Sequence, residues 1–282
     1  MPIQFSRPAG LVAYITCGDP DLETSRDVAL AAIHAGADVI ELGVPFSDPV
    51  ADGPVIQRAS ERALQHGTGL PGVLDVARQI RQRSKAGLII FSYLNPILQF
   101  GMDQFCSAAA RAGVNGALVT DLPVEEAADY LRTMKAHQLA PVFLAAPTST
   151  DERLRDIARN SRGFVYAISR TGITGARQDL AADAESLVTR LRRFSKLPIA
   201  VGFGISTPEQ FAEVGRFADA AVVGSAIVQR IEDHPGREAA AVAEFLSSLT
   251  PGHKGLEPPA NATLTAKPRG ELASGQCRER HA

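Results

Sequence analysis

Three carboxylates stand in one short segment, VIELGVPFSDPVADG, which covers residues 39–53. Glu41 lies inside a run of strand-forming apolar residues, where a buried carboxylate is costly unless it is paired or used in a reaction. Asp52 follows in a loop that also contains Asp48. If Glu41 on a strand and Asp52 on the next loop face one substrate, the pair suits general acid–base chemistry without a cofactor.

Each of these carboxylates also has a purely structural interpretation. Glu41 would be a buried residue paired with an arginine or with backbone amides. The pairs Asp52-Gly53 and Asp48-Pro49 are both common in turns. The residue pattern alone leaves the two interpretations open.

Other reactive residue types avoid the places where chemistry is expected. None of the five lysines is placed to form a Schiff base, because they fall in predicted helices, in turns before strands or near the C-terminus: Lys85, Lys135, Lys196, Lys254 and Lys267. The six histidines avoid the ends of predicted strands, which argues against a histidine-bound metal. The three cysteines, Cys17, Cys106 and Cys277, are too scattered for a disulfide framework or a zinc site.

Glycine-rich segments in the second half of the chain form another constellation. GFGIST (202–207) and GSA (224–226) each follow an apolar run and each precede a predicted helix. Bare backbone amides at a helix N-terminus bind phosphate well, although ordinary turns into helices also favour Gly and Ser. Two such turns together favour a phosphate site. The segment TGITG (171–175) predicts a mobile loop, either a lid or a long connection.

Eight short strand-like runs alternate with helical patterns along the chain. They are mostly apolar, which is typical of a parallel sheet covered on both faces: residues 11–16, 38–42, 87–93, 116–120, 140–145, 164–168, 198–203 and 219–224. Two helix starts are also recognisable, from Ser149 with Glu152 and from Thr207 with Gln210. The pattern predicts an α/β protein with a single-domain (β/α)8 TIM barrel, more than an open doubly wound sheet.

In such a barrel the active site lies at the C-terminal ends of the strands. Asp19 and Asp121 follow predicted strands and are therefore further candidates beside Glu41 and Asp52. Residues 1–9 are predicted to be a short N-terminal segment, 10–249 the barrel and 250–282 a disordered polar tail.

The composition limits the class of protein. The 282 residues are 45% hydrophobic and 21% charged with a net charge of −2, as expected for a globular enzyme. The lack of a basic cluster argues against nucleic acid as a partner. No apolar run is long enough for a membrane span or resembles a signal peptide, so a cytoplasmic protein is expected.

These motifs resemble those of the tryptophan synthase alpha subunit family. VIELGVPFSDPVADGPVIQ (39–57) matches the signature segment of that family. Five more motifs occur in the family's order: TCGDPD (16–21), TDLPVEE (120–126), SRTGITG (169–175), GFGIS (202–206) and GSAIV (224–228). The resemblance covers roughly residues 10–248. It implies a (β/α)8 barrel that cleaves indole-3-glycerol phosphate to indole and glyceraldehyde 3-phosphate.

The resemblance also implies roles for single residues. Glu41 and Asp52 take the two catalytic positions. The positions that bind substrate are Tyr14, Tyr93, Tyr166, Thr174 and Phe203, those that bind phosphate are Gly175, Gly204, Gly224 and Ser225, and Pro45 and Asp48 lie in the loop that contacts the partner.

The chemistry of the cleavage gives the two carboxylates distinct tasks. Asp52 would stabilise the cation that forms when indole C3 is protonated. Glu41 would remove the proton of the glycerol hydroxyl, and it is also a candidate to deliver the C3 proton. Burial in an apolar strand should raise the pKa of Glu41 toward neutral pH.

The implied partner is a beta subunit that uses pyridoxal phosphate, in an alpha2-beta2 tetramer with two copies of each subunit; the chain itself is expected to need no cofactor. Relatives begin with a longer segment, so the bottom of this barrel would be open, plugged by Ile3 and Phe5, or closed by a partner.

Three alternatives remain in view. They are a stand-alone indole-3-glycerol phosphate lyase, a catalytically weak regulatory barrel, and another phosphate-binding barrel such as a sugar-phosphate isomerase. The intact carboxylate pair disfavours the weak barrel, and the SDPVADG loop matches only the synthase family.

Overall fold

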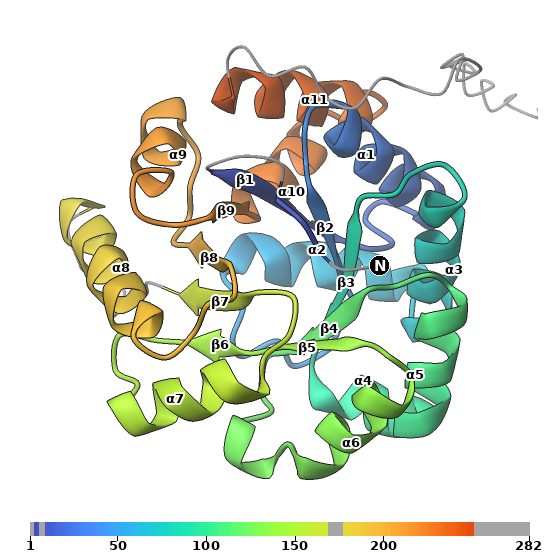
Figure 1. The fold of residues 1–282 in the computed structure, drawn as a ribbon. Coiled ribbons are helices and arrows are strands. Elements are labelled where there is room, and N and C mark those ends of the chain that lie inside the picture. The colour runs from blue at the N-terminus through green and yellow to red at the C-terminus, as the bar shows by residue number, and fades with distance from the viewer. Residues whose placement is uncertain (1–2, 6–8, 169–176, 251–282) are drawn as a thin grey trace, which may run out of the picture.

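A ring of parallel strands forms the centre of the molecule in the computed structural model, which describes residues 3–5, 9–168 and 177–250 (Figure 1). The strands found in this part of the chain are β1 (Gly10–Thr16), β2 (Val39–Gly43), β3 (Gly87–Ser92), β4 (Gly116–Val119), β5 (Ala140–Val142), β6 (Leu144–Ala145), β7 (Val165–Ile168), β8 (Ile199–Gly202) and β9 (Ala220–Val223). They form one sheet in the order β5-β4-β3-β2-β1-β9-β8-β7-β6.

The two ends of this sheet meet in one continuous run of chain. Strand β5 pairs with β4 and strand β6 pairs with β7, and only Phe143 separates β5 from β6. The predicted strand 140–145 is therefore one run that changes neighbour at Phe143. The predicted eight-stranded (β/α)8 barrel is confirmed. The open doubly wound sheet is wrong, because the two end strands of the sheet, β5 and β6, belong to one continuous run of chain.

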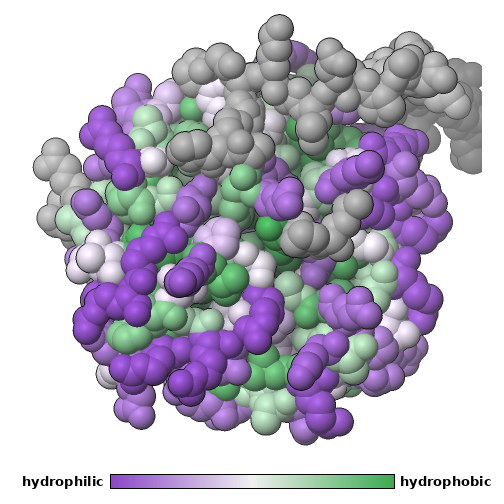
Figure 2. All heavy atoms as spheres, in the orientation of Figure 1, coloured by the Kyte–Doolittle hydropathy of each residue, from purple (hydrophilic) through white to green (hydrophobic). Residues whose placement is uncertain are grey.

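Helices surround the strands on the outside of the ring (Figure 1). Their bounds are α1 (Leu22–His34), α2 (Pro54–Gln65), α3 (Leu70–Arg81), α4 (Leu94–Phe100), α5 (Met102–Arg111), the 3-10 turn η1 (Val124–Glu126), α6 (Ala128–Ala136), α7 (Asp151–Asn160), α8 (Arg177–Arg192), α9 (Pro208–Val214), α10 (Ser225–Asp233) and α11 (Glu238–Leu249). On the face that Figure 2 shows, hydrophilic residues cover much of the rim, as expected for helices that bury one face against a sheet.

The starts of two helices test the predicted capping residues. Helix α9 begins with the predicted capping box. The Thr207 hydroxyl accepts a hydrogen bond from the Gln210 backbone amide, and the Gln210 side chain accepts one from the Thr207 backbone amide. The predicted cap at Ser149 is wrong, because Thr150 caps α7 by accepting from the Arg153 amide at 3.2 Å. The helix therefore starts one residue later than the sequence pattern indicated.

Strand alternation divides the core into an interior and an outer layer. Val39 on β2 belongs to the cluster inside the barrel, with Val12, Ile89 and Leu118 from neighbouring strands. Ile40, the next residue, belongs to the cluster between the strands and the helices. Because side chains alternate along a strand, Glu41 points into the barrel, one step above Val39 toward the strand ends.

Residues at the start of the described chain fill the bottom of the barrel. Ile3 is 8% exposed, and Phe5 packs its ring edge-on against Phe164 with centroids 5.9 Å apart. Of the three alternatives for the bottom of the barrel, open, plugged by Ile3 and Phe5, or closed by a partner, this arrangement corresponds to the plug. A cavity of about 790 Å³ lies beside the plug, bordered by Ile3, Lys135 and Arg162 among others.

Candidate active site

Glu41 is fully buried in the interior of the barrel, with 0% of its surface exposed. Neither carboxyl oxygen has a hydrogen-bond partner in the part of the chain that the structure describes. The structural interpretation of Glu41, a pairing with an arginine or with amides, therefore finds no support there. Burial raises the pKa of Glu41 to about 8, so the neutral carboxylic acid predominates near neutral pH.

Asp52 occupies a different environment, in the loop just before α2. It is half-buried, and the Tyr93 hydroxyl donates a hydrogen bond to its Oδ2 at 3.0 Å. The Ala51 amide in turn donates to the Tyr93 hydroxyl oxygen at 2.9 Å. Burial raises the pKa of Asp52, and the Tyr93 hydrogen bond acts in the opposite direction. The loop is thus attached to the end of β3 through one tyrosine.

Tyr14 on β1 and Tyr166 on β7 bring the two carboxylates into one electrostatic environment. Burial raises the pKa of Tyr14 well above its usual value, and the charges of Asp52 and Glu41 add to this effect. Burial likewise raises the pKa of Tyr166 well above its usual value, and the charge of Glu41 raises it further by a smaller amount. Both phenols therefore remain protonated donors beside the two carboxyl groups. The structure thus brings these four predicted residues into one region of the barrel, with Glu41 in its interior and Asp52 on the loop that follows β2.

Two strand-end glycines make room for these tyrosines, a role that the sequence did not indicate for either. A methyl group at Gly43 would lie 2.4 Å from the Tyr14 hydroxyl oxygen, and one at Gly202 would lie 2.7 Å from the Tyr166 hydroxyl oxygen. The geometry is the same in both cases. Each glycine lies two residues beyond the strand partner of its tyrosine, Glu41 for Tyr14 and Ala200 for Tyr166. A strand-end glycine beside a strand with an inward tyrosine is the sequence signal that identifies such positions.

The backbone at the start of α10 is open to solvent. Its N-cap is Gly224, and no side chain caps the helix, whereas Thr207 caps α9. Ser225 is exposed, and Gly204 has a φ of +85° with open space where a side chain would stand. Free amides and the positive end of the helix dipole suit an anion at this position.

Three predicted site residues occupy other positions or lie outside the description. Phe203 is partly buried and packs against the outer core beyond β8. Thr174 and Gly175 lie outside the described residues.

The loop predicted to contact a partner has one buried and one exposed member. Asp48 is exposed, and the Ser47 hydroxyl lies 2.5 Å from its Oδ2. Val50 beside it is 87% exposed, which is unusual for a large apolar side chain. Pro45, by contrast, is buried, so it shapes the loop and presents no free surface.

Two further strand-end candidates have structural partners. Asp19 is 3% exposed and binds the Arg62 guanidinium through both carboxyl oxygens, at 2.7 and 2.8 Å. Asp121 accepts a hydrogen bond from the Leu94 amide at 2.7 Å. Asp19 is thus paired with an arginine, whereas Glu41 has no hydrogen-bond partner among the described residues.

The described residues contain no cluster of three histidine, cysteine or acidic side chains that could hold a metal ion. None of the helices described is both long and apolar enough to cross a membrane.

Comparisons with known proteins agree on one family. The family model described as Tryptophan synthase alpha chain matches residues 4–255. The tryptophan synthase alpha chain of Solibacter usitatus is 52% identical over 240 residues, which are 85% of this chain and 89% of the relative. That of Geobacter sulfurreducens is 49% identical over 243 residues, covering 85% of this chain and 91% of the relative.

Solved structures give the same result. Tryptophan synthase subunit alpha from Legionella pneumophila superposes with a TM-score of 0.79 at 39% identity, covering 86% of this chain and 91% of that chain. A chain of Mycobacterium tuberculosis tryptophan synthase superposes with a TM-score of 0.80 at 36% identity, covering 88% and 93%.

Proposed function

The chain belongs to the tryptophan synthase alpha chain family, and from this premise we propose how its own residues carry out the reaction of that family. The reaction is the cleavage of indole-3-glycerol phosphate to indole and glyceraldehyde 3-phosphate in tryptophan biosynthesis, and the chain is a lyase. One observation supports the mechanism most directly. Glu41 is buried without a hydrogen-bond partner among the described residues, and its pKa is raised to about 8.

Glu41 acts first as an acid. The bond between indole C3 and the glycerol chain breaks only after C3 has gained a proton, which makes the ring cationic. A carboxylic acid that is neutral near pH 7 can supply this proton. The carboxyl of Glu41 is also positioned on a rigid strand in a water-poor interior, where a short transfer needs little rearrangement.

Asp52 stabilises the cation that this step creates. Its carboxylate accepts a hydrogen bond from the indole N–H, where the positive charge develops. Tyr93 holds the carboxylate by donating to Oδ2, and this hydrogen bond favours the ionised form.

Glu41 then acts as a base in the bond-breaking step. As the carbon–carbon bond breaks, its electron pair restores the aromatic indole ring. The neighbouring hydroxyl oxygen forms the aldehyde carbonyl, and its proton passes to the Glu41 carboxylate. Glu41 is neutral again at the end, so one proton has moved from the hydroxyl to C3 and the residue is ready for another turnover.

The remaining site residues bind the two ends of the substrate. The phosphate binds at Gly224 and Ser225, at the uncapped start of α10, with Gly204 beside it. Tyr14, Tyr93 and Tyr166 line the space for the indole ring. Thr174 and Gly175 lie outside the described residues, and in this proposal Thr174 contacts Asp52 and Gly175 binds the phosphate.

A beta subunit is implied by membership of an alpha chain family, and we place the chain in an alpha2-beta2 tetramer. Asp48 and Val50 on the exposed loop are the residues of this chain that we assign to the contact, with Pro45 shaping the loop. The alpha chain needs no cofactor of its own in this proposal, and pyridoxal phosphate belongs to the partner. The cytoplasm is its proposed location.

The test is an assay of indole release by the isolated chain and by the chain with the beta subunit. We expect low activity alone and stimulation by the partner. High activity alone that the partner leaves unchanged would favour a stand-alone lyase. No turnover in either condition would favour a catalytically weak regulatory barrel.

Variants test the assigned residues in the same assay. Glu41→Gln and Asp52→Asn should each lose at least ~100-fold in rate, the lower range for general acid–base groups. Normal turnover in both would rule out the mechanism while leaving the lyase activity itself in place.

A further inference from the structure

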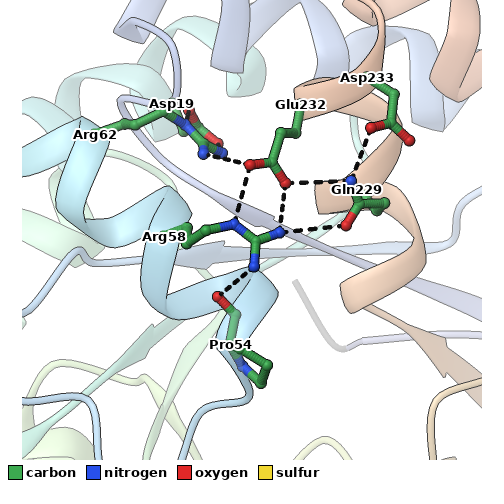
Figure 3. Close-up of polar contacts among 7 residues, drawn as sticks. All are labelled: Asp19, Pro54, Arg58, Arg62, Gln229, Glu232 and Asp233. Atoms are coloured by element: carbon green, nitrogen blue, oxygen red, sulfur yellow. Dashed lines mark hydrogen bonds and ion pairs between the residues drawn. The ribbon is translucent and has the colours of Figure 1, made fainter.

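Four charged side chains join two helices at the side of the proposed site. They come from three segments, the loop after β1 (Asp19), helix α2 (Arg58 and Arg62) and helix α10 (Glu232), and we call them the ionic clamp (Figure 3). In Figure 3 the two arginines of α2 point toward Glu232, which reaches across from α10.

The clamp has a fixed end and a linking end. At the fixed end, Arg62 binds Asp19 through two hydrogen bonds of 2.7 and 2.8 Å, and Asp19 is only 3% exposed. At the linking end, Glu232 accepts from Arg62 at 2.8 Å and from Arg58 at 2.7 and 3.1 Å. Hydrogen bonds from Arg58, and then the charge of Arg62, lower the pKa of Glu232 to about 2, so it is ionised near neutral pH.

An apolar contact lies on the inner side of the same helix pair. Ala59 of α2 and Val228 of α10 are both fully buried and cluster with Tyr14 of β1. Val55 and Ile56 of α2 are partly buried and pack against the same cluster. Apolar packing thus holds the two helices together, and the charge-assisted bonds of Glu232 add directed contacts that fix how α10 lies along α2.

Both helices begin at residues of the proposed site. Helix α2 starts directly after Asp52 and Gly53, and helix α10 starts at Gly224 and Ser225, where the phosphate is placed. The separation between Asp52 and the bound phosphate thus depends on how α2 and α10 lie relative to each other. A substrate held by its phosphate on α10 meets Asp52 correctly only if this separation is kept.

We propose that Glu232 is a positioning residue, which fixes α10 against α2 and thereby sets the distance between Asp52 and the phosphate end of the substrate. The inference rests on the proposed function, because it uses the assigned roles of Asp52 and of the start of α10. Glu232 contacts no substrate and acts only through the two helices.

Glu232→Gln is the most direct variant, because it keeps the shape of the side chain and leaves the buried Asp19–Arg62 pair intact. We expect kcat for cleavage of indole-3-glycerol phosphate, measured with the beta subunit present, to fall about tenfold, since small misplacements of reacting groups cost up to ~100-fold. KM and inhibition by inorganic phosphate should change less than about twofold, because the phosphate site itself lies on α10 and moves with it.

A double-mutant cycle separates positioning from general weakening of the fold. If Glu232 acts through Asp52, Glu232→Gln should cost less than about twofold in an Asp52→Asn background. Asp151→Asn is the matched control. Asp151 also takes two arginines across a helix pair, Arg190 and Arg193 at 2.9 and 3.0 Å, but these lie at and just beyond the C-terminal end of α8. Its loss should leave kcat unchanged.

The outcomes distinguish this inference from the function on which it rests. Normal turnover of Asp52→Asn would overturn the role of Asp52 and the positioning role with it. If Asp52→Asn is impaired while Glu232→Gln has normal kcat, or loses the same factor in both backgrounds, the proposed function stands and the positioning role is wrong. An equal loss in Asp151→Asn would also overturn it, because any interhelical ion pair would then have the same effect.

Discussion

Strand β2 and the loop that follows it hold their carboxyl groups in opposite ways. Glu41 is fully buried, has no hydrogen-bond partner among the described residues and has a pKa raised to about 8. Asp52, further along the same segment, is half-buried and accepts a hydrogen bond from Tyr93. One segment thus supplies a neutral carboxylic acid, Glu41, and a carboxylate that is fixed by a hydrogen bond, Asp52. The difference arises from solvation, because the interior of the barrel excludes water while the loop lies at its mouth.

The largest expected effect is the loss of turnover when the strand carboxyl is replaced. Glu41→Gln should reduce kcat by about 100- to 10,000-fold, because both proton transfers depend on this group. Steady-state indole release, measured with the beta subunit present, provides the test. A loss smaller than that of Asp52→Asn would reverse the assigned importance of the two carboxyl groups.

The same variant should be more stable than the parent protein at high pH. The pKa of Glu41 is about 8 when folded and about 4.3 when unfolded, so the parent loses stability as the pH rises between these values. A glutamine side chain does not ionise, and each pH unit corresponds to about 1.4 kcal/mol. The free energy of unfolding of Glu41→Gln, relative to the parent, should therefore rise by about 4 kcal/mol from about pH 5 to about pH 8. Urea unfolding at the two pH values measures it, and a constant difference would mean that Glu41 titrates normally.

The pH profile of the parent enzyme should show which form of Glu41 starts the reaction. Because the neutral acid is proposed to act first, kcat/KM should fall about tenfold per pH unit above about pH 8. A profile that instead rises through about pH 8 would assign Glu41 to start as a base. The residual activity of Glu41→Gln serves as the control, since it should lack this limb.

Removal of the Tyr93 hydroxyl tests how far Asp52, on the loop, depends on its hydrogen bond. Tyr93→Phe deletes the hydrogen bond to Asp52 and should reduce kcat about tenfold, the range expected for a hydrogen bond to a charged group. The pKa of Asp52 should also rise, because this hydrogen bond lowers it, so the acid limb of the profile should move to higher pH. In the Asp52→Asn background the substitution should have little further effect, and a full additional loss would separate Tyr93 from Asp52.

The smallest expected effect concerns the close contact between Gly202 and Tyr166 in the barrel interior. Gly202→Ala would place a methyl group 2.7 Å from the Tyr166 hydroxyl oxygen and should cost about 1–3 kcal/mol of stability by overpacking. Tyr166→Phe removes that oxygen, so the double variant should regain most of the loss. Thermal unfolding of the two single variants and the double variant gives the answer, and additive losses would show that the contact is not the cause.

Much of this protein follows from local patterns in the sequence. The alternation of strands and helices predicted the barrel, since each short apolar run needs cover on both faces and a closed ring provides it. Glu41 was recognisable because a carboxylate in an apolar run is energetically costly. Its inward direction followed from strand alternation, because Val39, two residues earlier, lies on the same face. The turn at Gly224 was recognisable as a strand-to-helix connection rich in Gly and Ser.

Only the tertiary structure decided which side chains meet across the barrel. The sequence does not contain the offset between neighbouring strands, and this offset brings Gly43 under Tyr14 and Gly202 under Tyr166. The pairing of Asp19 with Arg62, 43 residues later, removed a strand-end carboxylate from the candidates. The link from Glu232 to α2 likewise joins residues about 170 positions apart. Such contacts depend on the closure of the ring. The full burial of Glu41 depends on it too, because its strand alone sets only the direction in which the side chain points.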